Sequence, residues 1–437
     1  MASPVRLAGG KDRWQARPGS IGPARDLTPD TRHQGGEGCE PQPRLHMTDA
    51  DASIAPPRTS SAVATPRCAP ATLLPPDLHK PSKPTYLRAS MASDVSARIT
   101  DVRGVTVGHW TDLPRATGCT VVLAPDGGMR AACVVRGRAT GTRELDALDP
   151  HHLVDRVDAI LLTGGSAYGL GAADGVMRWL RERGRGLPVG PAGIVPIVPT
   201  AVIFDFDLAP GGKADRWPVA DDAYRACAAA STDVAEGSVG AGTGATVGKA
   251  LGPRAAMKGG VGTWSATGGG GGDGGGGGGG GGSDIVVGAL VVVNAVGNVM
   301  DGSGKILAGA RGPDGTLIDA LSHLASGASP FGAQAPNAAS GRNTTLAVIA
   351  TNATLDRTAL QGLAHAAGDA LARRIIPYGT LFDGDVVFAI STAARAPATP
   401  LQAEALAGLV VPIAVERAVR LATGARDIPG LADGRAK

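Results

Sequence analysis

Asn343, Thr344 and Thr345 stand directly before an apolar, β-branched run that extends from Leu346 to Thr351. A threonine at the start of a strand has an ordinary explanation, since β-branched side chains fit the surface of a sheet. It also has a chemical one, because a threonine that becomes a chain N-terminus can act as a nucleophile with its own α-amine as general base. The ordinary pKa of an α-amine is about 7.7–8.0, so no histidine is required. The Asn343–Thr344 bond is therefore a candidate for self-cleavage, with Thr344 as the nucleophile.

Three further stretches place polar groups beside predicted strands. Asn294 ends a strongly apolar run and is either a turn-capping residue or an amide that stabilises an oxyanion. Lys249 is either a solvated surface lysine or a cation that lowers the pKa of a nearby amine or binds a carboxylate. Asp383 and Asp385 flank Gly384 ahead of another apolar run, where they form an ordinary turn or orient the threonine amine and hydroxyl. The residue types alone leave each pair of alternatives open.

The glycine-rich stretch 240–250 resembles nucleotide-binding loops but departs from both common patterns. For a phosphate-binding loop, Thr243 stands where the first glycine belongs and Ala250 where Ser or Thr is required. A dinucleotide-binding loop needs a strand before it, and the preceding residues do not have that pattern. The eight histidines lack metal-ligand spacing, and the sequence contains no Gly-x-Ser-x-Gly elbow. We therefore predict no cofactor and no metal.

The elements that must position these residues alternate between strands and helices. A hairpin is predicted over 97–110, and apolar runs predict strands at 119–125, 131–135, 159–165, 201–209, 284–297 and 385–392. Helical patterns cover 166–184, 219–231, 357–375 and 400–424. Strands that are apolar throughout must be covered on both faces, so this order favours a layered α/β or α+β fold with helices on its sheets.

Two segments do not fit a packed domain. Residues 1–97 carry 14 of the 32 prolines and show no periodicity, which predicts a disordered extension or a wrongly assigned start, with Met91 as an alternative initiator. Residues 268–282 are almost entirely glycine, which has no side chain to pack and the largest backbone entropy to lose. We expect this run to be a flexible loop inserted between two strands.

Charge and cysteine usage limit the partners and the location. Residues 1–97 hold 12 basic and 9 acidic residues, whereas the rest of the chain holds 30 of each, so the body has no basic excess for nucleic acid or an anionic membrane. The five cysteines show no pairing pattern, the first residues contain no secretory apolar region, and no apolar run reaches membrane-spanning length. These features predict a cytoplasmic protein with reduced thiols.

Seven motifs, taken together, resemble the P1 family of self-cleaving aminopeptidases and amidases, peptidase family S58. They lie in order within residues 98–425 and read ITDVRGVTVGHWTD, LLTGGSAYGLGAADGV, VGAGTGATVGK, MKGGVGT, GALVVVNAVGNVMD, NTTLAVIATNA and DGDVVFAIST. The resemblance implies a four-layer αββα sandwich similar to N-terminal-nucleophile hydrolases but with different connectivity. It also implies one domain made of a large chain, 98–343, and a small chain, 344–437, with such pairs usually assembled as tetramers.

The same resemblance assigns Thr344 as the nucleophile and Asn343–Thr344 as the scissile bond. Many members of the family have serine at this position, and the threonine of this chain is similar to that of the nylon-oligomer hydrolases. The N-terminal extension and the glycine run fall outside the family pattern.

The remaining candidate site residues are also implied by this resemblance. Lys249 and Asn294 match an active-site lysine and asparagine of the nylon-oligomer branch. Asp383 and Asp385 match its paired aspartates. Tyr168, which follows the Gly-Gly-Ser-Ala turn, matches a tyrosine that the aminopeptidases place in the active site.

The sequence thus predicts an autoprocessed amide hydrolase, most simply a homo-oligomeric aminopeptidase that releases N-terminal residues from peptides or amides. Four alternatives stay open: an acyltransferase of ornithine-acetyltransferase-like architecture, an endo-acting oligoamide hydrolase, a nucleotide-dependent enzyme that uses residues 240–250, and a non-catalytic binding protein.

Overall fold

A computed structural model describes the chain over residues 96–209, 211, 213–268, 285–328, 342–394 and 399–434. The described residues all belong to one compact unit. Our predictions for residues 1–95 and for most of the glycine run lie outside the described residues.

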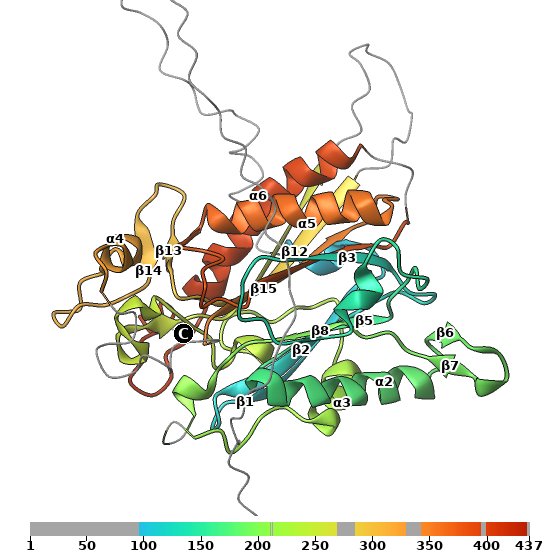
Figure 1. Cartoon of the computed structure of the whole chain (residues 1–437), viewed down its shortest axis with the longest axis horizontal. Helices are drawn as coiled ribbons and strands as arrows, with labels where there is room; N and C mark the ends of the chain where they lie inside the picture. The colour runs from blue at the N-terminus through green and yellow to red at the C-terminus, as the bar shows by residue number, and fades with distance from the viewer. Residues whose placement is uncertain are drawn as a thin grey trace, which may run out of the picture. The chain divides into compact units, whose positions relative to one another are not determined.

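Two five-stranded sheets form the centre of this unit (Figure 1). The first sheet contains, in spatial order, β1 (Thr106–Asp112), β2 (Thr117–Leu123), β5 (Ala159–Thr163), β8 (Thr200–Val202) and β4 (Thr142–Arg143). The second contains β11 (Val261–Gly268), β12 (Ile285–Asn294), β15 (Thr344–Thr351), β17 (Val386–Ser391) and β3 (Arg130–Val135). Neighbouring strands are antiparallel except for β5 with β8 and β15 with β17, which are parallel.

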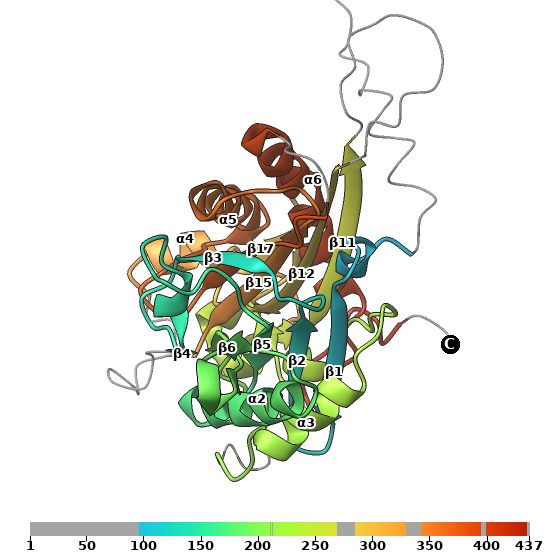
Figure 2. The same ribbon diagram turned by 90° about the vertical axis from the view of Figure 1, so that its right-hand side faces the viewer.

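Helices cover the outer face of each sheet, which gives four layers (Figures 1 and 2). The helices α2 (Ala173–Glu182) and α3 (Ala220–Ala228) pack on the first sheet. The helices α5 (Arg357–Ala372) and α6 (Pro400–Arg420) pack on the second. A separate apolar core fills the space between the two sheets. The predicted α+β sandwich is therefore confirmed.

The alternation of side chains along β12 shows how one strand serves two cores. Ala289 and Val291 point into the core beneath α5 and α6, whereas Leu290 and Val292 point into the core between the sheets. Successive side chains of a strand face opposite sides, so a strand covered on both faces must be apolar throughout. This is why the run that ends at Asn294 lacks the polar alternation of a half-exposed strand.

Small residues replace aromatic ones in these layers, in keeping with an aromatic content of only 3%. Gly262 of β11 lies directly beneath α6, where an added Cβ would stand 2.0 Å from the carbonyl oxygen of Ala414. No side chain fits that distance, so the close contact between helix and sheet requires glycine there.

Smaller elements surround the sandwich. They are a sheet of β14 (Ile306–Ala308), β13 (Asn298–Met300) and β16 (Ile375–Ile376), the pair β10 (Met257–Lys258) and β9 (Thr246–Val247), the hairpin of β6 (Leu187–Pro188) and β7 (Ile194–Val195), and the helix α4 (Ala320–Ala325). Among the described helices, none combines the length and apolar character needed to cross a membrane.

Three predicted elements differ from the structure. Ile99–Asp101 is a 3₁₀ turn rather than the first strand of a hairpin, and Ser166–Ala172 is a 3₁₀ segment ahead of α2. The strand predicted at 201–209 ends at Val202 and is followed by a 3₁₀ turn at Phe206–Leu208. Here Asp205 is buried and accepts hydrogen bonds from other parts of the chain, so tertiary contacts outweigh the local preference for a strand.

Candidate active site

All of the candidate residues except Tyr168 meet at one edge of the second sheet, where β12 ends and β15 and β17 begin. Asn294, the last residue of β12, lies opposite Thr344, the first residue of the antiparallel strand β15. Because β17 runs parallel to β15, the residues that precede β17 reach the same edge. Asn343 and Asp383 form an isolated bridge there. Sheet register alone therefore brings together residues that are far apart in sequence.

The Thr344 hydroxyl lies against the peptide bond that precedes it. Its Oγ1 atom is 2.5 Å from the carbonyl oxygen of Asn343, and the backbone N–H of Gly384 donates to the same oxygen at 2.7 Å. Asn343 and Thr344 are both buried. A Cβ on Gly384 would stand 2.8 Å from Thr344 Oγ1, so glycine is needed for this approach. An N–H directed at a carbonyl oxygen can stabilise the negative charge that nucleophilic attack would create on it.

Asn294 and Lys249 form a buried polar pair next to this bond. Lys249 Nζ donates to Asn294 Oδ1 at 2.7 Å and to the carbonyl oxygen of Arg342 at 3.1 Å. The Asn294 amide nitrogen donates to the carbonyl oxygens of Phe204 at 3.0 Å and Arg342 at 3.3 Å, and Asn294 Oδ1 also accepts from the backbone N–H of Thr246 at 3.0 Å. Neither side chain is a turn cap or a solvated surface group.

Opposing effects of the surroundings set the pKa of Lys249. Burial lowers the pKa of Lys249 to about 8. The carboxylates of Asp207, Asp383 and Asp205 oppose this shift, and the guanidinium of Arg342 adds to it. A lysine in this state is partly neutral near pH 8, so it can either carry positive charge or accept a proton.

Asp383 and Asp385 hold the start of β15 and the turn before β17. Asp385 Oδ1 accepts from the backbone N–H of Thr345, and its Oδ2 accepts from Gly379 at 3.0 Å. Asp383 Oδ2 accepts from the N–H and the hydroxyl of Thr380 at 2.8 and 2.6 Å. Burial raises the pKa of Asp383, and burial together with the neighbouring Asp383 raises the pKa of Asp385 well above its ordinary range.

A second buried lysine was not singled out as a site residue by the sequence. Lys258 is fully buried, and its Nζ donates to the carbonyl oxygens of Thr243 and Ala245 at 2.8 Å each. Its backbone pairs with Thr246, whose N–H contacts Asn294. Lys258 thus fixes the loop that carries Thr246 and, a few residues later, Lys249. A lysine between apolar Met257 and a Gly-Gly pair is the signal that could have indicated burial.

Asp205 supplies part of the negative charge near these lysines. It accepts from the Thr117 hydroxyl at 2.7 Å and from the Gly165 N–H at 2.9 Å. Burial raises its pKa to about 6, while these hydrogen bonds and the charge of Lys258 limit the rise. The sequence prediction treated this stretch as strand and missed its chemistry.

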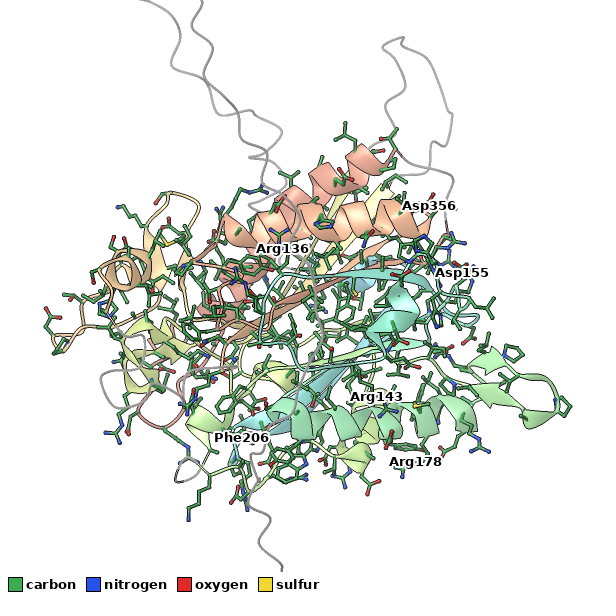
Figure 3. The ribbon with its side chains drawn as sticks, in the orientation of Figure 1. Arg136, Arg143, Asp155, Arg178, Phe206 and Asp356 are labelled. Atoms are coloured by element: carbon green, nitrogen blue, oxygen red, sulfur yellow. The ribbon has the colours of Figure 1, made fainter. Side chains whose placement is uncertain are left out.

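Tyr168 lies apart from the polar cluster. It is 61% exposed, its ring stacks on Trp217 at 4.6 Å, and it meets Phe206 edge-on at 6.5 Å. Phe206, labelled in Figure 3, in turn contacts the ring of Phe204 at 5.3 Å. The structure therefore connects Tyr168 to the site through aromatic rings, with the backbone of Phe204 touching Asn294.

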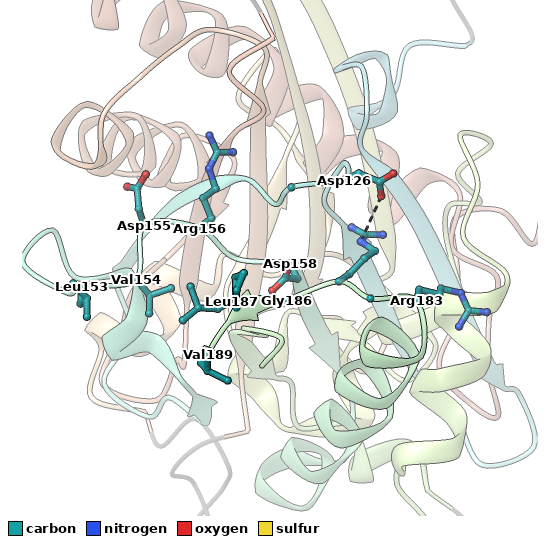
Figure 4. A pocket seen from close by; sticks show the side chains of 14 residues that line it. Asp126, Leu153, Val154, Asp155, Arg156, Asp158, Arg183, Gly186, Leu187 and Val189 are labelled. Carbon is teal, nitrogen blue, oxygen red and sulfur yellow. Dashed lines mark ion pairs between the residues drawn. The ribbon is translucent and has the colours of Figure 1, made fainter. Parts of the chain in front are cut away.

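A pocket of about 890 Å³ lies elsewhere on the unit (Figure 4). Its lining includes Leu153, Arg156, Asp158 and the segment 183–189, and none of the candidate site residues. Asp126 and Arg185 form an ion pair at its edge, with 3.7 Å between the charged atoms. This pocket is separate from the polar cluster around Thr344.

Comparison with known proteins gives a consistent result. The sequence model described as peptidase family S58 matches residues 97–427. An uncharacterized aminopeptidase of Mycobacterium tuberculosis is 47% identical over 315 residues, which is 68% of this chain and 82% of the relative. A 6-aminohexanoate-oligomer endohydrolase of Kocuria sp. is 32% identical over 298 residues, 67% of this chain and 74% of the relative.

Among solved structures, the L-aminopeptidase D-Ala-esterase/amidase of Ochrobactrum anthropi, described as a variant of the Ntn-hydrolase fold, superposes with a TM-score of 0.56. The match covers 76% of this chain and 89% of that protein at 20% identity. At this identity the likeness extends to the fold alone.

Proposed function

This chain belongs to peptidase family S58 and is a hydrolase of peptide or amide bonds, and we propose that Thr344 is its nucleophile, released as a new N-terminus by self-cleavage. The observation that carries this proposal is the position of Thr344 Oγ1, 2.5 Å from the carbonyl oxygen of the bond it would cut. That bond is buried and its oxygen is already held by the Gly384 N–H.

Self-cleavage begins with attack of Thr344 Oγ on the carbonyl carbon of Asn343. The negative charge that develops on the Asn343 oxygen faces the Gly384 N–H at 2.7 Å. When the C–N bond breaks, the Thr344 nitrogen takes up a proton and the Asn343 acyl group is carried as an ester on Oγ. Water then hydrolyses this ester, which leaves a carboxylate on Asn343 and a free α-amine on Thr344.

In turnover the freed α-amine accepts the proton of its own hydroxyl as Oγ attacks a substrate amide, and it passes that proton to the departing amine as the substrate C–N bond breaks. Water then hydrolyses the acyl ester on Oγ, which releases a carboxylate and restores the Thr344 hydroxyl. Asn294 and Lys249, which contact the acyl side of the scissile bond in the intact chain, stabilise the charged intermediate. Lys249 also disfavours protonation of the neighbouring amine. Asp385 positions β15 through the Thr345 N–H, and Asp383 holds the turn that carries Gly384.

The substrates proposed are peptides and small amides with a free N-terminal residue, as the relatives named aminopeptidases support. An endo-acting oligoamide hydrolase is the second candidate, because the Kocuria relative has that activity in its name. A panel of amino-acid p-nitroanilides and capped oligoamides separates the two. An assay of acetyl transfer to glutamate tests the acyltransferase alternative.

We expect a homo-oligomer of cleaved pairs, which size-exclusion chromatography with light scattering can measure. We also expect a reducing, cytoplasmic environment, supported by the three described cysteines, Cys119, Cys133 and Cys227, which are free thiols.

Intact mass and N-terminal sequencing of the purified protein test the central step. We expect a small fragment that begins Thr-Thr-Leu-Ala-Val and a single uncut chain for Thr344→Ala. Thr344→Ser should still be cut, since serine keeps the hydroxyl. An active wild-type protein that stays in one piece would overturn the proposal.

A further inference from the structure

The residue before the scissile pair is held in the site by both its backbone and its side chain. The carbonyl oxygen of Arg342 accepts from Lys249 Nζ at 3.1 Å and from the Asn294 amide at 3.3 Å. Its guanidinium lies 3.5 Å from Asp207 Oδ1 and 5.5 Å from the ring centroid of Phe204. Asn343 is the residue whose acyl group Thr344 would take, so Arg342 corresponds in the intact chain to the residue one position before the acylated residue of a substrate.

Asp207 has capacity that Arg342 does not use. Its side chain is 12% exposed, its Oδ1 faces the guanidinium, and its buried Oδ2 has no hydrogen-bond partner within the described part of the chain. A buried carboxylate that loses its cation is costly unless another cation replaces it. Phe204 beside it offers a ring face, which attracts cations as well.

From this arrangement we propose that Asp207 and Phe204 form a subsite for a cationic group on the acyl side of the substrate, an ammonium or guanidinium at the end of a flexible chain. The proposal rests on the hydrolase mechanism above, because only scission at Asn343–Thr344 places Arg342 near a free chain end that can leave. The departing guanidinium is then replaced by a substrate cation of the same charge and reach.

Asp207 lies in the stretch 201–209, where the apolar pattern predicted a strand and no functional role for this residue. The alternation Phe-Asp-Phe-Asp at 204–207 would have placed both aspartates on one face of that strand. In the structure the two separate: Asp205 bonds to Thr117 and Gly165, whereas Asp207 faces Arg342. The 3₁₀ turn at Phe206–Leu208 produces this separation.

The test compares Lys-Asn p-nitroanilide with Nle-Asn p-nitroanilide, in which the first residue corresponds to Arg342 and only its side-chain ammonium differs, and it follows release of the intact dipeptide together with p-nitroaniline. We expect the wild type to prefer the lysine substrate, and Asp207→Asn to raise KM for it about tenfold with little change in kcat. Hydrolysis of the norleucine substrate should change less than twofold. Asp215→Asn, at an exposed aspartate of the same connecting segment, is the matched control and should leave both substrates unaffected.

Equal loss on both substrates, or no preference in the wild type, would overturn the subsite. Binding to Arg342→Ala, which empties the position, gives a readout that needs no catalysis. We expect n-butylguanidinium to raise its melting temperature and the neutral n-butylurea to leave it unchanged; equal effects would also refute the subsite. If wild-type protein stays uncut and inactive while n-butylguanidinium still binds Arg342→Ala selectively, the mechanism fails and the subsite stands.

Discussion

Lys249 Nζ lies 2.7 Å from Asn294 Oδ1, and neither residue has any exposed surface. The two residues come from different elements, the 3₁₀ segment after β9 and the end of β12, and together they contact the carbonyl of Arg342. A buried ammonium without partners is strongly unfavourable, so Asn294 is needed as much to accommodate Lys249 as to act on a substrate.

Asn294→Ala removes the main side-chain acceptor of Lys249 and should destabilise the fold by about 3 kcal/mol while slowing self-cleavage at least ~100-fold. Urea unfolding and gel analysis of chain cleavage measure the two effects. Asn352→Ala is the control, because Asn352 is also buried and bonds the Val286 N–H at 2.9 Å, but after the opposite end of β15. It should lose stability yet be cut at the wild-type rate; slow cleavage in both variants would contradict the assignment.

Gly384→Ala should slow self-cleavage by about 100-fold, because its Cβ would stand 2.7 Å from the Ala139 carbonyl oxygen and 2.8 Å from Thr344 Oγ1, so the Gly384 N–H and the hydroxyl could not both keep their positions. A time course of cleavage after rapid purification measures the rate. Gly302→Ala serves as control, since the nearest atom to its Cβ would be 3.6 Å away in a flexible arginine side chain. Wild-type cleavage in Gly384→Ala would mean that this approach does not matter.

Thr345→Val should leave cleavage and activity within about twofold of wild type and raise stability slightly. Thr345 Oγ1 is buried without a hydrogen-bond partner in the described region, so an isosteric methyl removes a cost of up to about 1 kcal/mol. Thr351→Val is the counterpart: its hydroxyl accepts from the Ala353 N–H at 3.1 Å, so that variant should lose about 1 kcal/mol. Loss of cleavage in Thr345→Val would point to the wrong threonine as nucleophile.

Lys258→Met should flatten the dependence of stability on pH. Burial lowers the pKa of Lys258 from 10.5 to about 7, so between these values the unfolded chain binds more protons than the folded one. The free energy of unfolding therefore rises with pH across this window. Below pH 7, Lys258 is protonated in both the folded and the unfolded chain, so it contributes no further change of stability with pH. Urea unfolding of the uncut Thr344→Ala protein from pH 7 to 10 should show a shallower rise when Lys258→Met is added. Lys305→Met, at an exposed lysine, should keep the parent slope.

The sandwich could be predicted from the sequence because of continuous apolar runs such as 284–297 and 385–392. Strands that are apolar on both faces must be covered on both faces, which requires layers on either side of the sheet. Asn294 lies opposite Thr344 because of the sheet register, which local sequence patterns do not specify. Their shared site was predicted only from the resemblance to a family. Lys258 and Asp207 were missed for a related reason. Their environment is created by loops that leave the strands, where tertiary contacts override local preference.

The place of β15 has a consequence for reversibility. Strand β15 lies between β12 and β17 in the second sheet. The chain from residue 344 onwards supplies β15, which pairs with both of these strands, and the helices α5 and α6 that cover the sheet. A protein divided at this bond would have to rebuild its central sheet from two separate polypeptides after denaturation. Recovery of the native state would then depend on protein concentration, whereas the uncut precursor would refold at a rate independent of dilution.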